Sequence, residues 1–344
     1  MDPIRAVIYG VGTVGRVMTR LMVEKGVLIV GAIDVSPSLM GKDLGTVAGL
    51  GHKLNVSVNN QADIVLSENR ADIAVAAIFD EMERMYPIYK KCVENGLNVM
   101  TTASEALYPW MSSPELSAKL DRLAKKHGVT VTGCGNQDFY LVNAASLLTG
   151  LCQHLESVTL RIQTNTENYG LEMSRSVHVG ESKEEFARAM RESGKEPMNF
   201  MTFCLESIIN DLGLSVKHIE QRLEPAIADV DVESRVLGKV IKKGFVTGTL
   251  QTVEITTIQG PKFRSEGSFK MFPPDQEDTK EWIIKGTPDA YMKFGKLDGA
   301  FTTCTQMVNR IPDILNSEPG LITIEKLPKL KYRPYPLHYH VRKD

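Results

Sequence analysis

A glycine-rich turn between two apolar segments constrains the fold of this chain more than any other feature. Residues 4–9 form the first apolar segment, and a helix-compatible stretch (16–25) and a second apolar segment (27–33) follow the turn. The turn itself reads Gly10-Val11-Gly12-Thr13-Val14-Gly15. This order predicts a strand, a turn, a helix and a second parallel strand, which is the unit that binds the pyrophosphate of a dinucleotide.

Five residues of this turn are expected to bind the cofactor. Gly10 allows the tight turn, Gly12 lets the phosphates approach the backbone, and Gly15 lets the helix pack closely on the strand. Thr13 and Val14 open the helix, whose first turn offers unpaired N–H groups and a partial positive charge to an anion.

Asp34, at the end of the second apolar segment, indicates which dinucleotide is bound. A carboxylate at this place accepts hydrogen bonds from the ribose hydroxyls of NAD and repels the 2′-phosphate of NADP. Residues 35–38 contain no arginine, but Lys42 is close enough in sequence to leave NADP open. We therefore predict NAD, with NADP possible. The alternative interpretation is that Asp34 only caps the following turn.

The composition argues against several classes of protein. The chain has 344 residues, 42% of them hydrophobic, and a net charge of -2 with both signs spread along it. A nucleic-acid or membrane partner is therefore not expected. The five cysteines are scattered without CxxC spacing, so neither disulfides nor a metal site is predicted. No apolar run approaches a membrane span and the first strand begins almost at once, which favours a cytoplasmic enzyme of small molecules.

The first half of the chain alternates apolar strands with helical stretches. We expect strands at residues 73–79, 97–101 and 129–132, with intervening helices that end near Asn95 and His127. This alternation predicts an α/β fold whose N-terminal part, residues 1–140, is a Rossmann domain with a doubly wound parallel sheet.

The pattern changes after residue 157. Alternating polar and apolar residues predict long strands at 158–164, 245–258 and 263–271, and helices are expected at 183–192 and 198–212. The sequence therefore predicts a second domain of α+β type, built on a mainly antiparallel sheet, which would bind the substrate.

The predicted boundaries of this second domain are residues 141 and 300. Residues 301–344 are expected to complete a helix at 298–310 and then to form an extended tail after Pro312. We expect this last part to return to the Rossmann domain.

Three loops follow the carboxyl ends of predicted strands, where open α/β sheets bind their ligands. They come after Phe79, Thr101 and Gly133. We expect Phe79, Thr102 and Asn136 to contact the cofactor, with the Asn136 side chain on the nicotinamide carboxamide.

Glu105 lies in the second of these loops and is the candidate catalytic residue. A carboxylate near the reactive carbon accepts a proton or stabilises a cation that develops as hydride leaves. The alternative is an exposed loop acid or the start of a helix. Cys134, in the third loop, raises a rival mechanism through a thiol nucleophile, but a small buried cysteine is the more common case.

Candidate substrate contacts lie further along the chain. Phe139 and Tyr140 open the helix after the third loop, and Tyr169, Arg175 and His178 follow the first strand of the second domain. A purely structural role is the alternative for His178.

Several motifs resemble the 2,4-diaminopentanoate dehydrogenases, relatives of dihydrodipicolinate reductase that include NAD(P)-dependent amine dehydrogenases. The similar segments are residues 31–34, 41–45, 101–105 and 147–152, so the likeness covers the first half well and the second half approximately. One departure is Asn136-Gln137-Asp138, where many members have Asn-Pro-Gly, and it leaves the identity of the amine open.

The resemblance implies oxidative deamination of an amine carbon, with 2,4-diaminopentanoate converted to 2-amino-4-oxopentanoate and ammonia. It also implies a catalytic glutamate at Glu105 and a homodimer. For a diamino acid, Glu172, Asn168 or Tyr169 would accept the second ammonium, and Arg175 or His178 would bind the carboxylate.

Two other functions stay open at this point. The first is an NAD-dependent alcohol or aldehyde dehydrogenase of the same architecture, although the Glu-Lys-Pro of sugar and inositol dehydrogenases is absent near Ser104-Glu105-Ala106. The second is a sensor protein that binds NAD without turnover.

Overall fold

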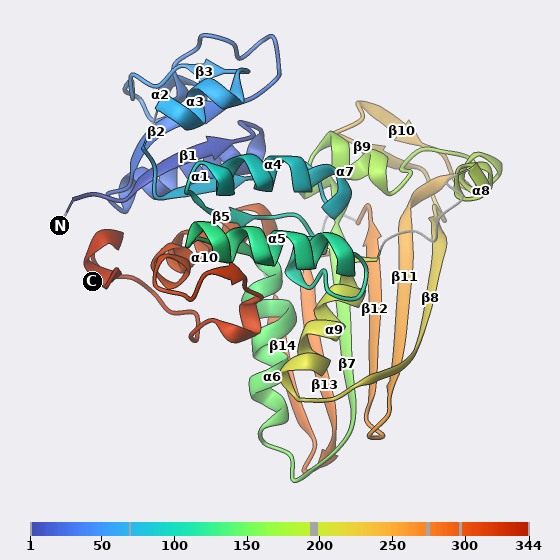
Figure 1. Cartoon of the computed structure of the whole chain (residues 1–344). Coiled ribbons are helices and arrows are strands. Elements are labelled where there is room, and N and C mark those ends of the chain that lie inside the picture. Colours follow the sequence, from blue (N-terminus) through green and yellow to red (C-terminus); the bar gives the residue numbers. More distant parts are fainter. Residues whose placement is uncertain (1, 69, 193–198, 273–275, 296–297, 343–344) are drawn as a thin grey trace. The chain divides into compact units, whose positions relative to one another are not determined.

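The computed structural model describes residues 2–68, 70–192, 199–272, 276–295 and 298–342. The chain divides into two compact units. The first consists of Met1–Phe139 together with Ala300–Asp344, and the second consists of Tyr140–Gly299. Figure 1 shows the helices and strands of both.

The first unit is built on a seven-stranded parallel sheet with the strand order β15-β6-β5-β4-β1-β2-β3. Its strands are β1 (Arg5–Tyr9), β2 (Leu28–Ile33), β3 (Val58–Asn59), β4 (Ile73–Ala76), β5 (Asn98–Thr101), β6 (Thr130–Gly133) and β15 (Gly320–Leu321). The order reverses between β1 and β4, which is where doubly wound sheets bind ligands. The predicted Rossmann fold is confirmed.

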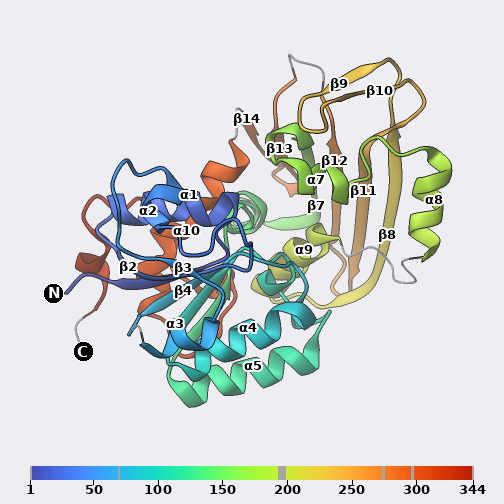
Figure 2. The ribbon, with the colours of Figure 1, turned by 90° about the horizontal axis from the view of Figure 1, so that it is seen from above.

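Helices cover both faces of this sheet (Figure 2). One face carries α3 (Ala62–Glu68), α4 (Met82–Glu94) and α5 (Pro114–His127), and the other carries α1 (Thr13–Glu24), α2 (Leu44–Ala48) and α10 (Gly299–Leu315). The apolar side chains of the strands and helices form a common core in which Val7, Tyr89 and Val99 are fully buried. Burial on both faces explains why the strands read as continuous apolar runs.

The last helix is longer than predicted. The sequence suggests that the chain becomes extended after Pro312, but α10 continues to Leu315. Proline removes only one helical N–H donor, and its fixed φ is compatible with a helix. Burial of Ile311 and Ile314 on the same turn offsets that loss. The prediction of an extended segment directly after Pro312 is therefore wrong.

The second unit contains a six-stranded mixed sheet in the order β14-β13-β7-β12-β11-β8, in which only β7 and β12 pair in parallel. The strands are β7 (His154–Asn165), β8 (Val216–Ile227), β11 (Val246–Thr257), β12 (Lys262–Lys270), β13 (Thr279–Thr287) and β14 (Ala290–Gly295). A small hairpin joins β9 (Val232–Ser234) to β10 (Lys239–Ile241). The predicted α+β fold with a mainly antiparallel sheet is confirmed.

The helices of this unit are α6 (Ala144–Thr149), α7 (Leu171–Ser176), α8 (Lys183–Glu192) and α9 (Phe200–Asp211), and a π-helix (Asp138–Asn143) precedes α6. Helix α6 packs on β13 and β14, and α9 packs on β11 and β12. The bounds of α8 match the prediction. The predicted start of α9 at residue 198 lies outside the described residues.

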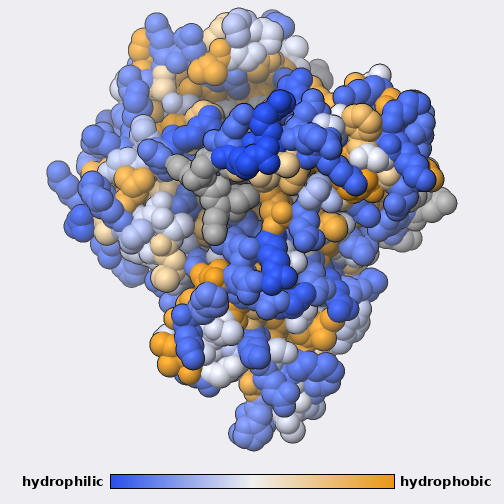
Figure 3. Space-filling model, turned by 90° about the vertical axis from the view of Figure 1, so that its right-hand side faces the viewer, coloured by the Kyte–Doolittle hydropathy of each residue, from blue (hydrophilic) through white to orange (hydrophobic). Residues whose placement is uncertain are grey.

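The other face of the six-stranded sheet is polar. Neighbouring strands are joined there by ion pairs such as Arg161–Glu266, Arg264–Glu254 and Lys293–Glu281. The surface seen from the side where β8 lies in Figure 1 is mainly hydrophilic as well (Figure 3). Within the described ranges, no helix has both the length and the apolar character needed to cross a membrane.

Candidate active site

The glycine turn after β1 has the geometry of a phosphate-binding loop. Gly10 has a φ of 101°, and a Cβ atom there would lie 2.4 Å from the carbonyl oxygen of Ala77. A Cβ on Gly15 would lie 2.0 Å from the carbonyl oxygen of Gly10. A Cβ on Gly12 would meet no atom within 4 Å, so the space beside it is open. Close packing therefore requires glycine at positions 10 and 15, and Gly12 borders the space that a pyrophosphate would fill.

The start of α1 suits an anion. Gly12 is the N-cap and supplies no side-chain cap, and the first turn holds no acidic residue. The N–H groups of Thr13 and Val14 therefore lie in a helix terminus with a partial positive charge. The residues present fit the pyrophosphate of a dinucleotide, and their role as cofactor contacts remains a prediction.

Asp34 connects the end of β2 to the glycine turn. Its Oδ2 accepts a hydrogen bond from the Val11 N–H at 2.7 Å, and its Oδ1 accepts one from the Ser36 N–H at 2.8 Å. Asp34 therefore does cap the next turn, as the alternative interpretation held. Each carboxylate oxygen accepts more than one hydrogen bond, so ribose hydroxyls still have acceptors here. The next side chain, Val35, is 81% exposed and offers no partner to a 2′-phosphate.

The loop after β6 holds an unused acceptor. The Oδ1 atom of Asn136 is buried and has no hydrogen-bond partner among the described residues. Nearby, Gln306 of α10 accepts a hydrogen bond from the Phe139 N–H at 2.9 Å, while its own Nε2 has no partner in the described part of the chain. A buried acceptor and a buried donor that lack partners match the N–H₂ and C=O of a carboxamide.

Two other predicted cofactor contacts lie in loops at the same edge of the sheet. Phe79 follows β4 and is half-buried, with the Arg84 guanidinium 3.6 Å from its ring centroid. Thr102 follows β5, and its Cγ2 lies 4.0 Å from where a Cβ on Gly135 would be. Gly135 has a φ of 124° and so favours glycine.

Glu105 begins the short 3-10 helix Glu105–Leu107 and is only 5% exposed. The exposed-loop alternative is therefore wrong, and the helix-start alternative describes its backbone. Its Oε2 accepts a hydrogen bond from the Met82 N–H at 2.6 Å, at the start of α4. Its Oε1 accepts hydrogen bonds from the hydroxyls of Ser112 at 2.7 Å and Ser113 at 2.6 Å.

These three hydrogen bonds fix the orientation of the Glu105 carboxylate. A carboxylate has about four acceptor positions, so one remains, on Oε2. Ser113 is the N-cap residue of α5, yet its hydroxyl does not cap that helix and bonds to Glu105 instead. The Ser113 hydroxyl therefore holds the Glu105 carboxylate and does not cap α5.

Cys134 does not have the environment of a nucleophile. It is 2% exposed, and burial raises the pKa of its thiol well above the usual range. Since a nucleophilic cysteine needs a depressed pKa, the thiol-nucleophile alternative has no support.

In the second unit, Tyr140 and Tyr169 approach the same pair of charged residues on or beside β13. The Nζ of Lys280 lies 5.4 Å from the centroid of the Tyr140 ring. The Tyr169 hydroxyl donates to Asp278 Oδ2 at 3.3 Å, and the Asn165 N–H donates to Oδ1 at 2.7 Å. Burial raises the pKa of both Asp278 and Tyr169.

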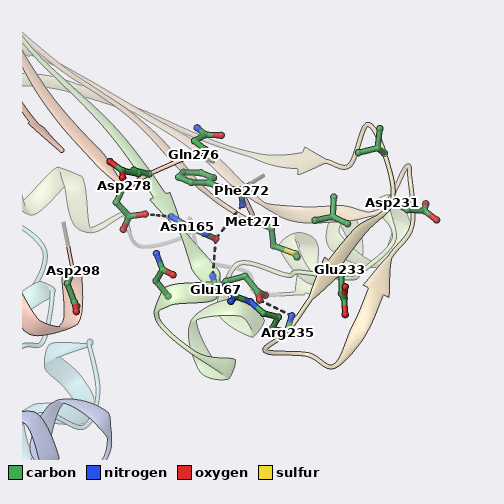
Figure 4. Close-up of a pocket in the computed structure, with 14 residues that line it drawn as sticks. Asn165, Glu167, Asp231, Glu233, Arg235, Met271, Phe272, Gln276, Asp278 and Asp298 are labelled. Atoms are coloured by element: carbon green, nitrogen blue, oxygen red, sulfur yellow. Dashed lines mark hydrogen bonds between the residues drawn. The ribbon is translucent and has the colours of Figure 1, made fainter. Parts of the chain in front are cut away.

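Asp278 also lines a cavity of about 1020 Å³ in this unit (Figure 4). Asn165, Glu167, Asp231 and Asp298 contribute to its wall. Glu167 is bound to the β9–β10 hairpin, where its Oε1 accepts from the Ser234 hydroxyl at 2.6 Å. An acidic wall favours cationic molecules such as amines.

The other two predicted substrate contacts, Arg175 and His178, lie on α7 and just after it. Arg175 is an exposed residue of α7. The Nδ1 of His178 lies 3.0 Å from Glu181 Oε2, and its ring packs edge-on against Phe186 with centroids 5.1 Å apart. This geometry favours the structural interpretation of His178.

Sequence reasoning missed Lys280, Asp278 and Gln306. Lys280 and Asp278 stand in the polar stretch Asp278-Thr279-Lys280-Glu281, and a polar stretch without periodicity is typical of a loop. Nothing in that pattern indicates that the charged residues at these two positions face inward. Gln306 lies in a helix whose position beside the 134–139 loop no local pattern reveals.

Comparison with known proteins adds a family assignment to this geometry. The family model described as "2,4-diaminopentanoate dehydrogenase C-terminal domain" matches residues 139–333. A 2,4-diaminopentanoate dehydrogenase of Acetoanaerobium sticklandii is 28% identical over 95% of this chain and 94% of its own length. The structure of an amine dehydrogenase from Mycobacterium smegmatis is 40% identical, with a TM-score of 0.92 over 97% of this chain and 98% of that one.

More distant structures share only the fold. GenD2 from gentamicin A biosynthesis, solved in complex with NAD, is 15% identical, with a TM-score of 0.53 over 86% of this chain and 73% of its own. Proteins with this fold therefore include one that was solved with bound NAD.

Proposed function

Because the chain belongs to the 2,4-diaminopentanoate dehydrogenase family of amine dehydrogenases, we propose that it oxidatively deaminates 2,4-diaminopentanoate to 2-amino-4-oxopentanoate and ammonia, reversibly. That it is an amine dehydrogenase follows from the family. The particular substrate is supported by the Acetoanaerobium sticklandii relative. The observation that carries the proposal is the buried and rigidly held Glu105 carboxylate at the carboxyl end of β5.

The overall reaction balances as R₂CH–NH₃⁺ + NAD⁺ + H₂O giving R₂C=O + NH₄⁺ + NADH + H⁺. When bound, the nicotinamide supplies the hydride acceptor. A free alkylammonium has a pKa of about 10.4, so it must lose a proton before hydride can leave its carbon. A base beside the amine is therefore required at neutral pH.

Glu105 is our candidate for that base. Its remaining acceptor position on Oε2 would take the ammonium proton and pass it to solvent, and the restored carboxylate would then stabilise the positive iminium by its charge. The same oxygen would orient the water that attacks the iminium carbon. Because Met82, Ser112 and Ser113 hold the carboxylate in place, little reorganisation is needed during these steps.

The cofactor is proposed to be NAD, with NADP use possible. Asp34 presents carboxylate oxygens where the adenosine ribose would lie, and the adjacent exposed residue is Val35 and not a cation. The buried acceptor on Asn136 supports binding of the nicotinamide carboxamide at the other end.

The test is NAD(P)H production from a panel of amines and alcohols, with ammonia measured in parallel. We expect 2,4-diaminopentanoate to yield equal amounts of NADH and ammonia. The Glu105→Gln variant should bind NADH normally and lose at least 100-fold in kcat, in keeping with loss of a general base. Glu115→Gln, an exposed acid on α5, is the matched control and should keep full turnover.

Other outcomes would point elsewhere. NADH formed from an alcohol without ammonia would replace amine oxidation by alcohol oxidation. Tight NADH binding with no turnover of any panel member would favour the sensor. Undiminished turnover in Glu105→Gln would remove this residue from the mechanism.

A further inference from the structure

Lys280 is an unusual residue in the second unit because its charge is buried and unpaired. The residue is 3% exposed and shares the inward side of β13 with Trp282 and Ile284, which are fully buried. Its cross-strand neighbours are Ile162 on β7 and Phe294 on β14. The Nζ atom lies over the Tyr140 ring and makes no hydrogen bond or ion pair within the described part of the chain.

The burial of Lys280 differs from that of a lysine with only a packing role. Lysine side chains usually bury their aliphatic stem and turn the ammonium to water, whereas only 3% of the surface of this residue is exposed. Burial lowers the pKa of Lys280 to about 8, against the opposing influence of the Asp278 carboxylate. The side chain is therefore still cationic near neutral pH, with three N–H donors and the face of the Tyr140 ring beside them.

Asp278 completes the arrangement. It directly precedes β13 and is two residues from Lys280, and like Lys280 it is 3% exposed. Asn165 and Tyr169 hold its carboxylate, and it lines the acidic cavity. Figure 4 shows its carboxylate directed away from Phe272 and Gln276, on the side of the cavity where Asp298 lies. A donor and an acceptor of opposite charge thus lie near each other without forming an ion pair.

We propose that Lys280 and Asp278 bind the amino-acid end of the substrate, the lysine donating to the α-carboxylate and the aspartate accepting from the α-ammonium. This inference rests on the proposed function and narrows it to amines that carry an α-amino acid group. It replaces the earlier assignment of the carboxylate to Arg175 or His178. A bound zwitterion would neutralise both charges at once, which explains why each is retained in a buried position.

Three substrates with the same five-carbon chain and the same reacting methyl-substituted carbon separate the two contacts. The first, 2,4-diaminopentanoate, carries both recognised groups. The second, 4-aminopentanoate, keeps the carboxylate but lacks the α-ammonium, and the third, 2-aminopentane, lacks both. Steady-state kcat and KM for each, with ammonia assayed, would be compared in wild type, Lys280→Met, Asp278→Asn and the exposed-lysine control Lys285→Met.

We expect Lys280→Met to lower kcat/KM about 30-fold or more for both carboxylate-bearing amines, mainly through KM, and to change it less than about threefold for 2-aminopentane. Asp278→Asn should act on 2,4-diaminopentanoate alone. Lys285→Met should change nothing. An equal loss for all three amines in Lys280→Met would overturn the proposal, as would a wild-type enzyme that oxidises 2-aminopentane but binds neither carboxylate-bearing amine.

A binding measurement separates this inference from the proposed function. Calorimetric titration of 2,4-diaminopentanoate into wild type and Lys280→Met, in the presence of NADH, needs no turnover. Binding lost in the variant supports the contact even if no amine is oxidised, whereas equal binding overturns it. The variant should fold, because replacing an unpaired buried charge by an apolar side chain removes a desolvation cost, and its Tm at pH 7 should equal or exceed that of wild type.

Discussion

The Arg310 guanidinium and the Asp138 carboxylate form a two-pronged ion pair that is fully buried in the first unit. Nε lies 2.5 Å from Oδ2 and Nη2 lies 2.9 Å from Oδ1, and both side chains are 0% exposed. Arg310 also approaches Asp313, which pairs with Arg333 of the tail. These ion pairs therefore connect the segment after β6 with α10 and, through Asp313, with Arg333 in the segment after β15.

This pair gives a physical role to the unusual Asn136-Gln137-Asp138 sequence. Asp138→Ala would leave Arg310 with the more distant Asp313 carboxylate and the Pro328 carbonyl, and we expect it to lower the free energy of unfolding by about 3 kcal/mol. Urea unfolding followed by circular dichroism measures this. The control Glu115→Ala removes an exposed ion pair with Lys119 and should cost less than about 1 kcal/mol. Similar losses in both variants would contradict the structural weight given to Asp138.

The Ser113 hydroxyl is expected to position Glu105. Ser113→Ala should lower kcat about tenfold and leave the Kd for NADH unchanged, because the hydroxyl touches the carboxylate and not the glycine turn. Ser113→Thr retains a hydroxyl and should recover most of the activity. If the threonine variant were as slow as the alanine variant, positioning by this hydroxyl would not be the explanation.

Asn136 is expected to recognise the N–H₂ of the nicotinamide carboxamide. Asn136→Ala should weaken NADH binding about three- to tenfold, the usual effect of one lost hydrogen bond. The reduced 3-acetylpyridine analogue has a methyl group in place of N–H₂, so the same substitution should not weaken its binding. Fluorescence titration with both dinucleotides measures these affinities. An equal loss of affinity for the two would show that Asn136 does not contact the N–H₂ of the carboxamide.

Glu206 of α9 makes stability depend on pH. It is 4% exposed, its Oε2 has no partner among the described residues, and burial raises the pKa of the carboxyl from 4.5 to about 7. The folded state therefore binds more protons than the unfolded state between these two values, and its contribution to stability falls as pH rises through that window.

Replacement by glutamine removes this dependence. At pH 8 Glu206→Gln should be more stable than wild type by up to about 3 kcal/mol, and near pH 4.5 the two should be alike. Calorimetric Tm values at both pH values test this, with Glu184→Gln on the surface of α8 as control. A pH-independent difference would mean that packing, not ionisation, is responsible.

The parts of the molecule that could be predicted from the sequence are those that a short-range sequence pattern defines. The glycine turn, Asp34 and the α8 helix follow from spacing and periodicity, because each depends on neighbours in the chain. Lys280 could not be predicted in this way. Its importance arises from strand pairing that sets it opposite Phe294 and Ile162 and from Tyr140, which is far away in sequence.

Glu105 illustrates the boundary between the two cases. Its place after a strand marked it as a candidate, but the hydrogen bonds from the hydroxyls of Ser112 and Ser113 that hold it could not be predicted from the sequence. Likewise, Pro312 predicted a helix end that burial of Ile311 and Ile314 overrides. The homodimer stays a prediction.

The pairing of β15 with β6 has a consequence for how the protein is made. The parallel sheet of the first unit is completed by Gly320 and Leu321, which are synthesised after the entire second unit. A nascent chain that ends at Phe139 therefore exposes an open strand edge at β6 and lacks Arg310, which pairs with Asp138 in the complete fold. The second unit is continuous in sequence and can therefore fold on the ribosome before Gly320 and Leu321 complete the sheet of the first unit.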